Sequence, residues 1–155
     1  MTLVVSDSSP LIALSQIQQL RLLHSLFGEV VIPEAVAREV APAVRLPEWI
    51  ITRPLAMRVD IEILHAKLGP GESEAITLAS QDRADWLLLD ERPGRRIAQA
   101  LGLRVAGTLG LLVRAKQKRL LTAVRPSLEA LVREGFYATP ALVARILEAA
   151  GEAEP

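Results

Sequence analysis

The sequence has no cysteine, few aromatic residues and no long apolar run. Without cysteine it forms neither disulfides nor thiolate metal sites, which fits a reducing compartment. No apolar stretch approaches the roughly 20 residues that span a bilayer. The N-terminus also lacks the positive start of a secretory signal. We therefore expect a cytoplasmic protein with no membrane segment.

The scarcity of histidine and the absence of glycine-rich motifs exclude several common kinds of site. His24 and His65 have no metal-binding partner at helical spacing, so a zinc site is not expected. There is no dinucleotide-binding Gly-x-Gly-x-x-Gly, no Walker loop, and no nucleophile elbow for a Ser-His-Asp triad. Aromatic residues make up only 3% of the chain, which argues against a base-stacking platform.

The charges balance overall but not along the chain. Residues 60–90 hold seven acidic and two basic residues, whereas residues 91–119 hold one acidic and eight basic residues. An acidic stretch followed by a basic one suits a metal site beside a phosphate-binding surface. Two ordinary solvated faces would give the same pattern, and charge alone favours that simpler interpretation.

What the sequence has in abundance is aliphatic side chains. Half of its 155 residues are hydrophobic, which is enough to bury a core in a chain of this size. No stretch has the composition of a linker, so we expect one domain over residues 1–150 and a frayed, disordered tail over residues 151–155.

Short apolar runs alternate with helical patterns along the chain. Strands are predicted at 2–6, 30–32, 49–52, 86–89 and 103–106, the one at 49–52 at a sheet edge. Helices are predicted at 7–17, 20–27, 33–40, 61–67, 72–79, 95–101, 107–116, 121–133 and 140–149. This alternation favours a three-layer α/β/α fold around a central, mostly parallel sheet.

Two acidic residues follow predicted strands directly. Asp7 comes after the first strand, and Asp90 comes after the apolar strand at 86–89. In an open parallel sheet, ligands bind beyond the carboxyl ends of the strands. Each residue alone could be a helix N-cap or a turn residue, but two acids at equivalent positions favour a shared site.

Three glutamates are further candidates. Glu72 and Glu74 open a helix, where acidic residues also complement the helix dipole. Glu39 lies on the helix that follows Pro33, and its ordinary interpretation is an exposed helical residue.

Four blocks of the sequence resemble, in order, the motifs of PIN-domain proteins. They are VVSDSSPLIAL at 4–14, VIPEAVAREV at 31–40, GESEAI at 71–76, and LLLDER at 87–92 with the glycines that follow. The resemblance covers about residues 3–116. It is nearest to an uncharacterised branch of PIN-like proteins related to VapC toxins.

The resemblance implies a metal-dependent ribonuclease, often the toxin of a toxin–antitoxin pair. Its substrate would be RNA, its cofactor Mg²⁺ or Mn²⁺, and its partners an antitoxin and a second copy of the chain. The catalytic acids carry over to Asp7, Glu39, Glu74 and Asp90, and the metal ligands to Asp7, Asp90 and either Glu74 or Glu72. Glu74 is preferred because Ala75 and Ile76 follow it as the family's small and apolar residues do, but the sequence leaves this choice open.

Substrate-binding residues are expected on both sides of the two aspartates. Ser8 or Ser9 resembles the family's hydroxyl residue beside the first aspartate, where it would steer water or a carboxylate. Arg92, Arg95 and Arg96 follow Asp90, and arginine binds phosphate through paired hydrogen bonds. A solvated helix face with ordinary ion pairs would explain the arginines equally well.

One departure from the family leaves an alternative open. The third acid is glutamate where VapC toxins usually have aspartate. The alternative is a PIN-like protein that has lost catalysis and binds nucleic acid or protein. A receiver-like phosphoacceptor ranks last, because the strand at 103–106 is followed by Gly107 and Thr108 and not by lysine.

Overall fold

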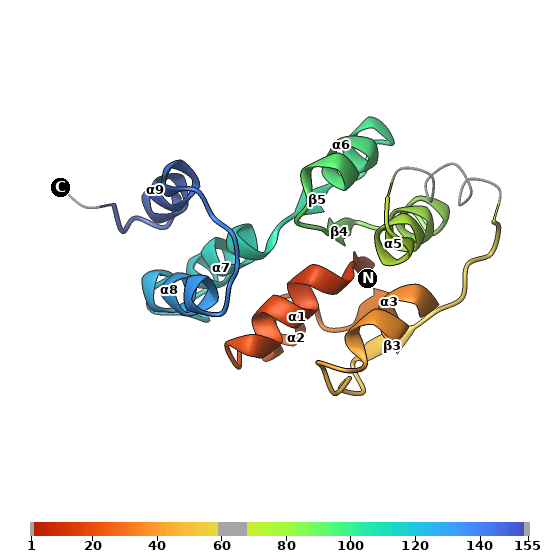
Figure 1. Ribbon diagram of the computed structural model, residues 1–155, viewed down its shortest axis with the longest axis horizontal. Coiled ribbons are helices and arrows are strands. Elements are labelled where there is room, and N and C mark those ends of the chain that lie inside the picture. Colours follow the sequence, from red (N-terminus) through yellow and green to blue (C-terminus); the bar gives the residue numbers. More distant parts are fainter. Residues whose placement is uncertain (1, 59–67, 154–155) are drawn as a thin grey trace.

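Strands and helices alternate along the chain in the computed structural model (Figure 1), which describes residues 2–58 and 68–153. The strands are β1 (Val4–Ser6), β2 (Val30–Ile32), β3 (Ile50–Thr52), β4 (Trp86–Leu88) and β5 (Val105–Ala106). The helices are α1 (Ser8–Gln16), α2 (Arg21–Phe27), α3 (Glu34–Val40), α5 (Pro70–Gln81), α6 (Arg92–Ala100), α7 (Thr108–Gln117), α8 (Arg125–Arg133) and α9 (Pro140–Ala149). The helix predicted at 61–67 lies outside the described residues.

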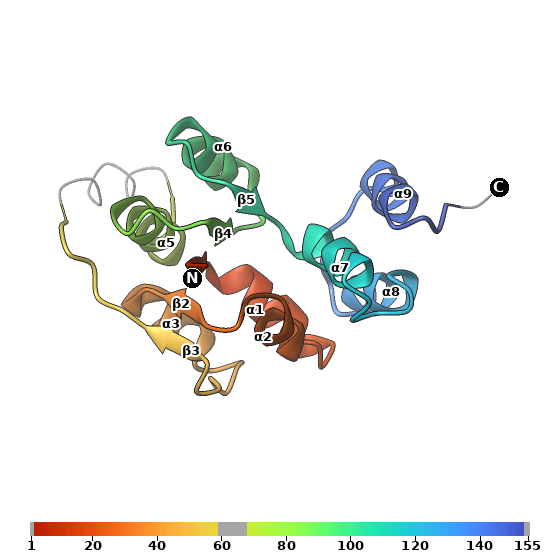
Figure 2. The same ribbon diagram turned by 180° about the vertical axis from the view of Figure 1, so that it is seen from behind.

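The strands form one sheet in the order β3-β2-β1-β4-β5, and each adjacent pair is parallel. Every residue of β1 and β2 is buried, as expected for strands covered on both faces. Figure 1 shows α1 and α3 on the near side, and Figure 2 shows α2 on the opposite side. The predicted three-layer α/β/α fold is confirmed, and so is the edge position of the strand near residue 50.

The chain reverses its course across the sheet between β1 and β4. It moves outward from β1 to β2 and β3, then returns to add β4 and β5 on the other side of β1. Ser6 pairs with Leu88, and the Asp7 N–H donates a hydrogen bond to the Leu88 carbonyl at 2.9 Å. The residues that follow β1 and β4 therefore lie side by side at the switch point where such sheets bind ligands.

Aliphatic side chains form the core between the sheet and its helices. Helix α5 is central, since it packs against α3 and α6 and also contacts β1 and β4. Helices α7, α8 and α9 lie together at one end of the molecule (Figures 1 and 2), and α7 joins them to α1. None of the described helices is long and apolar enough to cross a membrane.

Proline shifts the start of α6 from its predicted place. The sequence pattern predicts this helix from residue 95, whereas α6 begins at Arg92 with Pro93 in its first turn. Proline is favoured in the first turn because the N–H that it lacks would have no partner there. The helix predicted at 121–133 begins only at Arg125, again with proline in its first turn.

The described segment that follows α9 is held in place at Glu152. Its carboxylate accepts hydrogen bonds from the N–H groups of Val124 at 2.7 Å and Arg125 at 3.1 Å, and it contacts Lys116 Nζ at 3.0 Å. These hydrogen bonds, the one from Val124 first, lower the pKa of Glu152. The Glu152 carboxylate therefore caps the start of α8, where the positive end of the helix dipole also favours a negative charge.

Candidate functional site

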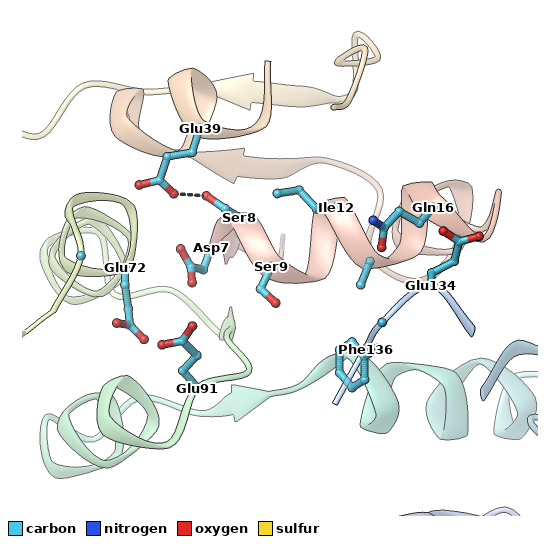
Figure 3. Close-up of a pocket in the computed structure, with 13 residues that line it drawn as sticks. Asp7, Ser8, Ser9, Ile12, Gln16, Glu39, Glu72, Glu91, Glu134 and Phe136 are labelled. Atoms are coloured by element: carbon cyan, nitrogen blue, oxygen red, sulfur yellow. Dashed lines mark hydrogen bonds between the residues drawn. The ribbon is translucent and has the colours of Figure 1, made fainter. Parts of the chain in front are cut away.

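A pocket of about 470 Å³ opens beyond the carboxyl end of β1. Its acidic residues include Asp7 at the end of β1, Glu39 on α3, Glu72 on α5 and Glu91 just before α6. Figure 3 shows the carboxylates of Asp7, Glu72 and Glu91 turned toward one another, with Glu39 beyond Ser8. These four carboxylates, which we call the acidic pocket, come from four separate parts of the chain.

Asp7 is held at the switch point with its side chain largely removed from water. It occupies the N-cap position of α1, yet its side chain makes no capping hydrogen bond, and only 7% of the residue is exposed. Burial raises the pKa of Asp7 to about 6, and the charges of Glu39, Glu91 and Asp90 add to that rise. A hydrogen bond from the Ser8 backbone lowers the pKa of Asp7 and so offsets part of this rise.

Glu72 is the most poorly satisfied carboxylate of the acidic pocket. It is 8% exposed, and its buried Oε2 atom has no hydrogen-bond partner among the described residues. Burial, followed by the charges of Glu91, Asp7 and Glu39, raises the pKa of Glu72 to about 7. A buried carboxylate oxygen without a partner is costly, so Oε2 is available to a cation.

Glu39 is fixed by two donors and by a close glycine. The Ser8 hydroxyl donates a hydrogen bond to Glu39 Oε2 at 2.5 Å, and the Gly71 N–H donates to Oε1 at 2.9 Å. A Cβ atom at position 71 would lie 2.6 Å from Glu39 Cδ, so the first turn of α5 comes this close only because it carries glycine.

Asp90 lies beside the acidic pocket and is held by three donors. The Ser9 hydroxyl donates to Oδ2 at 2.9 Å, the Thr108 hydroxyl donates to Oδ2 at 2.7 Å, and the Thr108 N–H donates to Oδ1 at 2.7 Å. Thr108 is fully buried at the start of α7. The structure therefore brings Asp90 near Asp7, as the strand-end argument expected.

Glu74, the third acid that the family resemblance favours over Glu72, lies elsewhere. Its Oε1 atom accepts a hydrogen bond from the Ala35 N–H at 3.2 Å, in the first turn of α3, and it does not line the pocket. Residues two apart on a helix differ by about 200° in direction, so Glu72 and Glu74 cannot both face the pocket. The structure places Glu72 there. The reverse contact also exists, since Glu39 of α3 accepts a hydrogen bond from the Gly71 N–H in the first turn of α5.

A family model described as a PIN domain (DUF3368) matches residues 3–152. The chain belongs to this PIN-domain family. Neither the curated proteins nor the solved structures compared with it contain a significant match. PIN domains are generally nucleases that use divalent metal ions, which implies a nucleic-acid substrate for this fold.

The serines and arginines expected to bind substrate lie in different places in this PIN domain. Ser8 and Ser9 line the pocket, but their hydroxyls donate to Glu39 and Asp90. Arg92 and Arg95 line a second groove next to it, whereas Arg96 lines neither space.

Sequence reasoning missed two acidic residues of the pocket. Glu91 follows Asp90 directly at the end of β4, and its place at the sheet edge was a signal that could have found it. Glu134 follows α8 and lies across the pocket near Gln16 in Figure 3. No local pattern marks Glu134, because only the packing of α8 brings it there.

The donors of the acidic pocket fit a hard divalent cation. All are carboxylate oxygens, the kind of ligand that Mg²⁺ and Mn²⁺ prefer, and Glu72 Oε2 lacks another partner. Within residues 2–58 and 68–153, no three acidic or histidine side chains form a compact chelating cluster as they stand. Mg²⁺ usually keeps several waters and uses one or two carboxylates, so the donor set suits a hydrated ion.

Proposed function

We propose that this PIN domain is a metal-dependent endoribonuclease, using Mg²⁺ or Mn²⁺, and that RNA phosphodiesters are hydrolysed in the acidic pocket. The observation that carries the proposal is the convergence of Asp7, Glu39, Glu72 and Glu91 at the β1–β4 switch point. The raised pKa values of Asp7 and Glu72 support it, because a cation would relieve the cost of crowding buried carboxylates.

Asp7 and Glu72 are the residues we assign to hold the ion. When bound, the ion would lower the pKa of an attacking water and neutralise charge that develops on the phosphate. Asp90 can contribute as well, since a carboxylate has about four acceptor positions and the three hydrogen bonds leave one free.

The remaining polar residues orient these acids. Ser8 and Gly71 set the position of Glu39, while Ser9 and Thr108 set that of Asp90. Glu39 and Glu91 face the same space, and we assign them the orientation of the attacking water. Glu74 has a structural role in this proposal, as the acceptor at the start of α3.

The first test is metal-dependent cleavage by wild type and an Asp7→Asn variant. The metal-stripped protein is incubated with a labelled RNA oligonucleotide, or the matching DNA, in Mn²⁺, Mg²⁺ or EDTA. We expect RNA cleavage only with metal, and a loss of about 100-fold in Asp7→Asn because a buried ligand charge is removed. Asp82→Asn is the matched control, since Asp82 pairs with Arg53 on the surface.

Three outcomes separate the alternatives. Equal cleavage by wild type and Asp7→Asn would remove the proposed site. Cleavage of DNA alone would correct the substrate. If calorimetry detects Mn²⁺ binding but neither RNA nor DNA is cleaved, the protein is a catalytically inactive PIN domain that serves as a binding module.

The biological setting is a separate proposal that rests on the resemblance to VapC toxins. We propose a cytoplasmic toxin that forms a homodimer and is silenced by an antitoxin protein. Induced expression of wild type should arrest bacterial growth, whereas Asp7→Asn at equal abundance should not. Growth arrest by both proteins would contradict the toxin proposal.

A further inference from the structure

A second groove, of about 1150 Å³, adjoins the acidic pocket. The two spaces share four lining residues, which are Ser9, Glu91, Gly135 and Phe136. One side of the groove comes from the ends of β4 and β5 with the start of α6. The other side comes from α7, α9 and the segment between α8 and α9. Figures 1 and 2 show α6 and α9 standing apart, with the chain from β5 to α7 running between them.

This groove gathers aromatic side chains that are rare in the sequence. The chain has five aromatic residues, and Phe27, Trp86, Phe136 and Tyr137 line the groove. Tyr137 is 84% exposed, and Phe136 stands where the groove meets the acidic pocket. The composition argued against a stacking platform, but the fold concentrates these few rings in one place.

The same groove gathers arginines without acidic partners. Arg92, Arg95, Arg114 and Arg145 line it. In the described part of the chain, ion pairs join Arg53 to Asp82 and Lys116 to Glu152, and none involves these four arginines. The Arg114 guanidinium lies 5.0 Å from the centroid of the Trp86 ring, and Arg95 donates a hydrogen bond to the Leu89 carbonyl at 3.2 Å. Arg92 and Arg145 are therefore the arginines that remain available for a ligand. We call this surface the arginine–aromatic groove.

We propose that the arginine–aromatic groove binds a single-stranded nucleic-acid segment and leads it into the acidic pocket. Arg92 and Arg145, both exposed, contact phosphates, and Tyr137 stacks on an unpaired base. A paired strand hides its base faces, so stacking on Tyr137 selects single strands. This inference rests on the proposed function, because the bound strand would end at the acidic pocket in which we propose that it is cleaved.

The charge of the groove and its place beside the acidic pocket favour nucleic acid over a protein occupant. Four arginines complement a phosphate backbone, and a strand lying in the groove would reach the acidic pocket through the shared residues. An apolar protein segment would leave the exposed charges of Arg92 and Arg145 without partners.

The test measures binding without cleavage. Fluorescence anisotropy in EDTA compares a labelled 12-nucleotide oligouridylate with an RNA duplex of equal length. Wild type should bind the single strand at least tenfold more tightly than the duplex. Tyr137→Ala and Arg145→Ala should each weaken single-strand binding about five- to tenfold. Arg145→Ala should also reduce the slope of log affinity against log salt by about 0.7.

Two matched variants sharpen the test. Tyr137→Phe keeps the ring and should bind within twofold of wild type. Arg133→Ala removes an exposed arginine of α8 that lines neither space, and it should also bind as wild type does. Tyr137 and Arg145 are exposed, so an unchanged melting temperature shows that their removal leaves the fold intact.

The outcomes distinguish this inference from the proposed function. Unchanged single-strand binding in Tyr137→Ala and Arg145→Ala, or equal binding of duplex, overturns the groove assignment even if the protein cleaves RNA. A loss of dimer in these variants with RNA binding intact assigns the groove to a protein interface and also overturns it. If both variants bind the single strand more weakly but wild type cleaves neither RNA nor DNA, the groove assignment stands and the nuclease proposal is overturned.

Discussion

The acidic pocket and the arginine–aromatic groove are neighbours built in different ways. The carboxylates of the pocket stand at a strand end and on helices, where burial raises the pKa of Asp7 and Glu72 and hydrogen bonds hold Glu39. The arginines and Tyr137 in the groove lie on outer helices and a connecting segment, and several are exposed. Under the two proposals above, a cation would relieve the repulsion among the carboxylates of the pocket, whereas the groove would bind a polyanion.

A smaller comparison within α5 teaches the same lesson. Glu72 and Glu74 are two residues apart, yet Glu72 is buried with an oxygen lacking a partner, and Glu74 accepts from the Ala35 N–H of α3. Our proposal therefore gives Glu72 a role in ligand binding and Glu74 a role in the fold. The predictions below test these contrasts in order of expected free energy.

The largest effect should be on the stability of the metal-free protein. Because the folded-state pKa values of Asp7 and Glu72 lie above their usual values, the stability from protonation is fully present below about pH 4 and is lost as pH rises through 6 to 7. Between pH 5 and pH 8, wild type should lose about 3–4 kcal/mol relative to an Asp7→Asn/Glu72→Gln double variant. Urea unfolding in EDTA measures this difference, and parallel pH profiles would contradict it.

The second prediction contrasts the two glutamates of α5. With saturating Mn²⁺, Glu72→Gln should slow RNA cleavage about 100-fold, or about 2.7 kcal/mol, because it removes a negative ligand. Glu74→Gln should change the rate less than about threefold while lowering stability by about 1 kcal/mol, since the helix start loses a charged acceptor. Initial rates and urea unfolding check both, and a larger rate loss in Glu74→Gln would reverse the assignment.

The third prediction concerns the donors that hold Asp90. Thr108→Val keeps the branched shape but removes the hydroxyl, and it should slow cleavage about tenfold because Asp90 loses one of its donors. Thr77→Val is the control, since its buried hydroxyl donates to the Ser73 carbonyl away from the pocket. Both should lose about 1 kcal/mol of stability, so equal cleavage rates would remove the role of Thr108.

The smallest effect should come from crowding Glu72. A Cβ atom at position 94 would lie 2.5 Å from Glu72 Oε2, so Gly94→Ala should displace that carboxylate. We expect Mn²⁺ affinity by calorimetry to fall about threefold to fivefold, or up to about 1 kcal/mol. Gly110→Ala places the same residue in a helix with nothing within 4 Å and should bind Mn²⁺ normally. Equal affinities in the two variants would contradict the close contact.

The fold could be predicted largely from local patterns. The apolar runs at β1, β2 and β4 identify strands because buried parallel strands are apolar throughout. Asp7 and Asp90 could be singled out because a residue that directly follows such a strand stands at the sheet edge. The start of α6 was misplaced because Pro93 and Gly94 suit a turn as well as a first helical turn.

Three features of the site could not be predicted from the sequence. They are the choice between Glu72 and Glu74, the presence of Glu134 in the pocket, and the gathering of the aromatic residues. The first depends on how α5 is rotated, since a turn of about 100° per residue decides which side chain faces a site. The other two depend on how α8 and the segment that follows it pack against the rest of the fold. Nothing in the sequence around Tyr137 marks it as a binding residue. Its neighbours in the groove include residues that are far from it along the chain, such as Phe27.

By itself, the sequence determined which segments are strands or helices and which acids follow the strands, because these properties depend on residues close together in the chain. Only the tertiary structure decided which carboxylates share one pocket and that arginines and aromatic rings lie beside them. The physical reason is that burial, charge repulsion and stacking act between side chains that are near in space, and packing alone brings those side chains together.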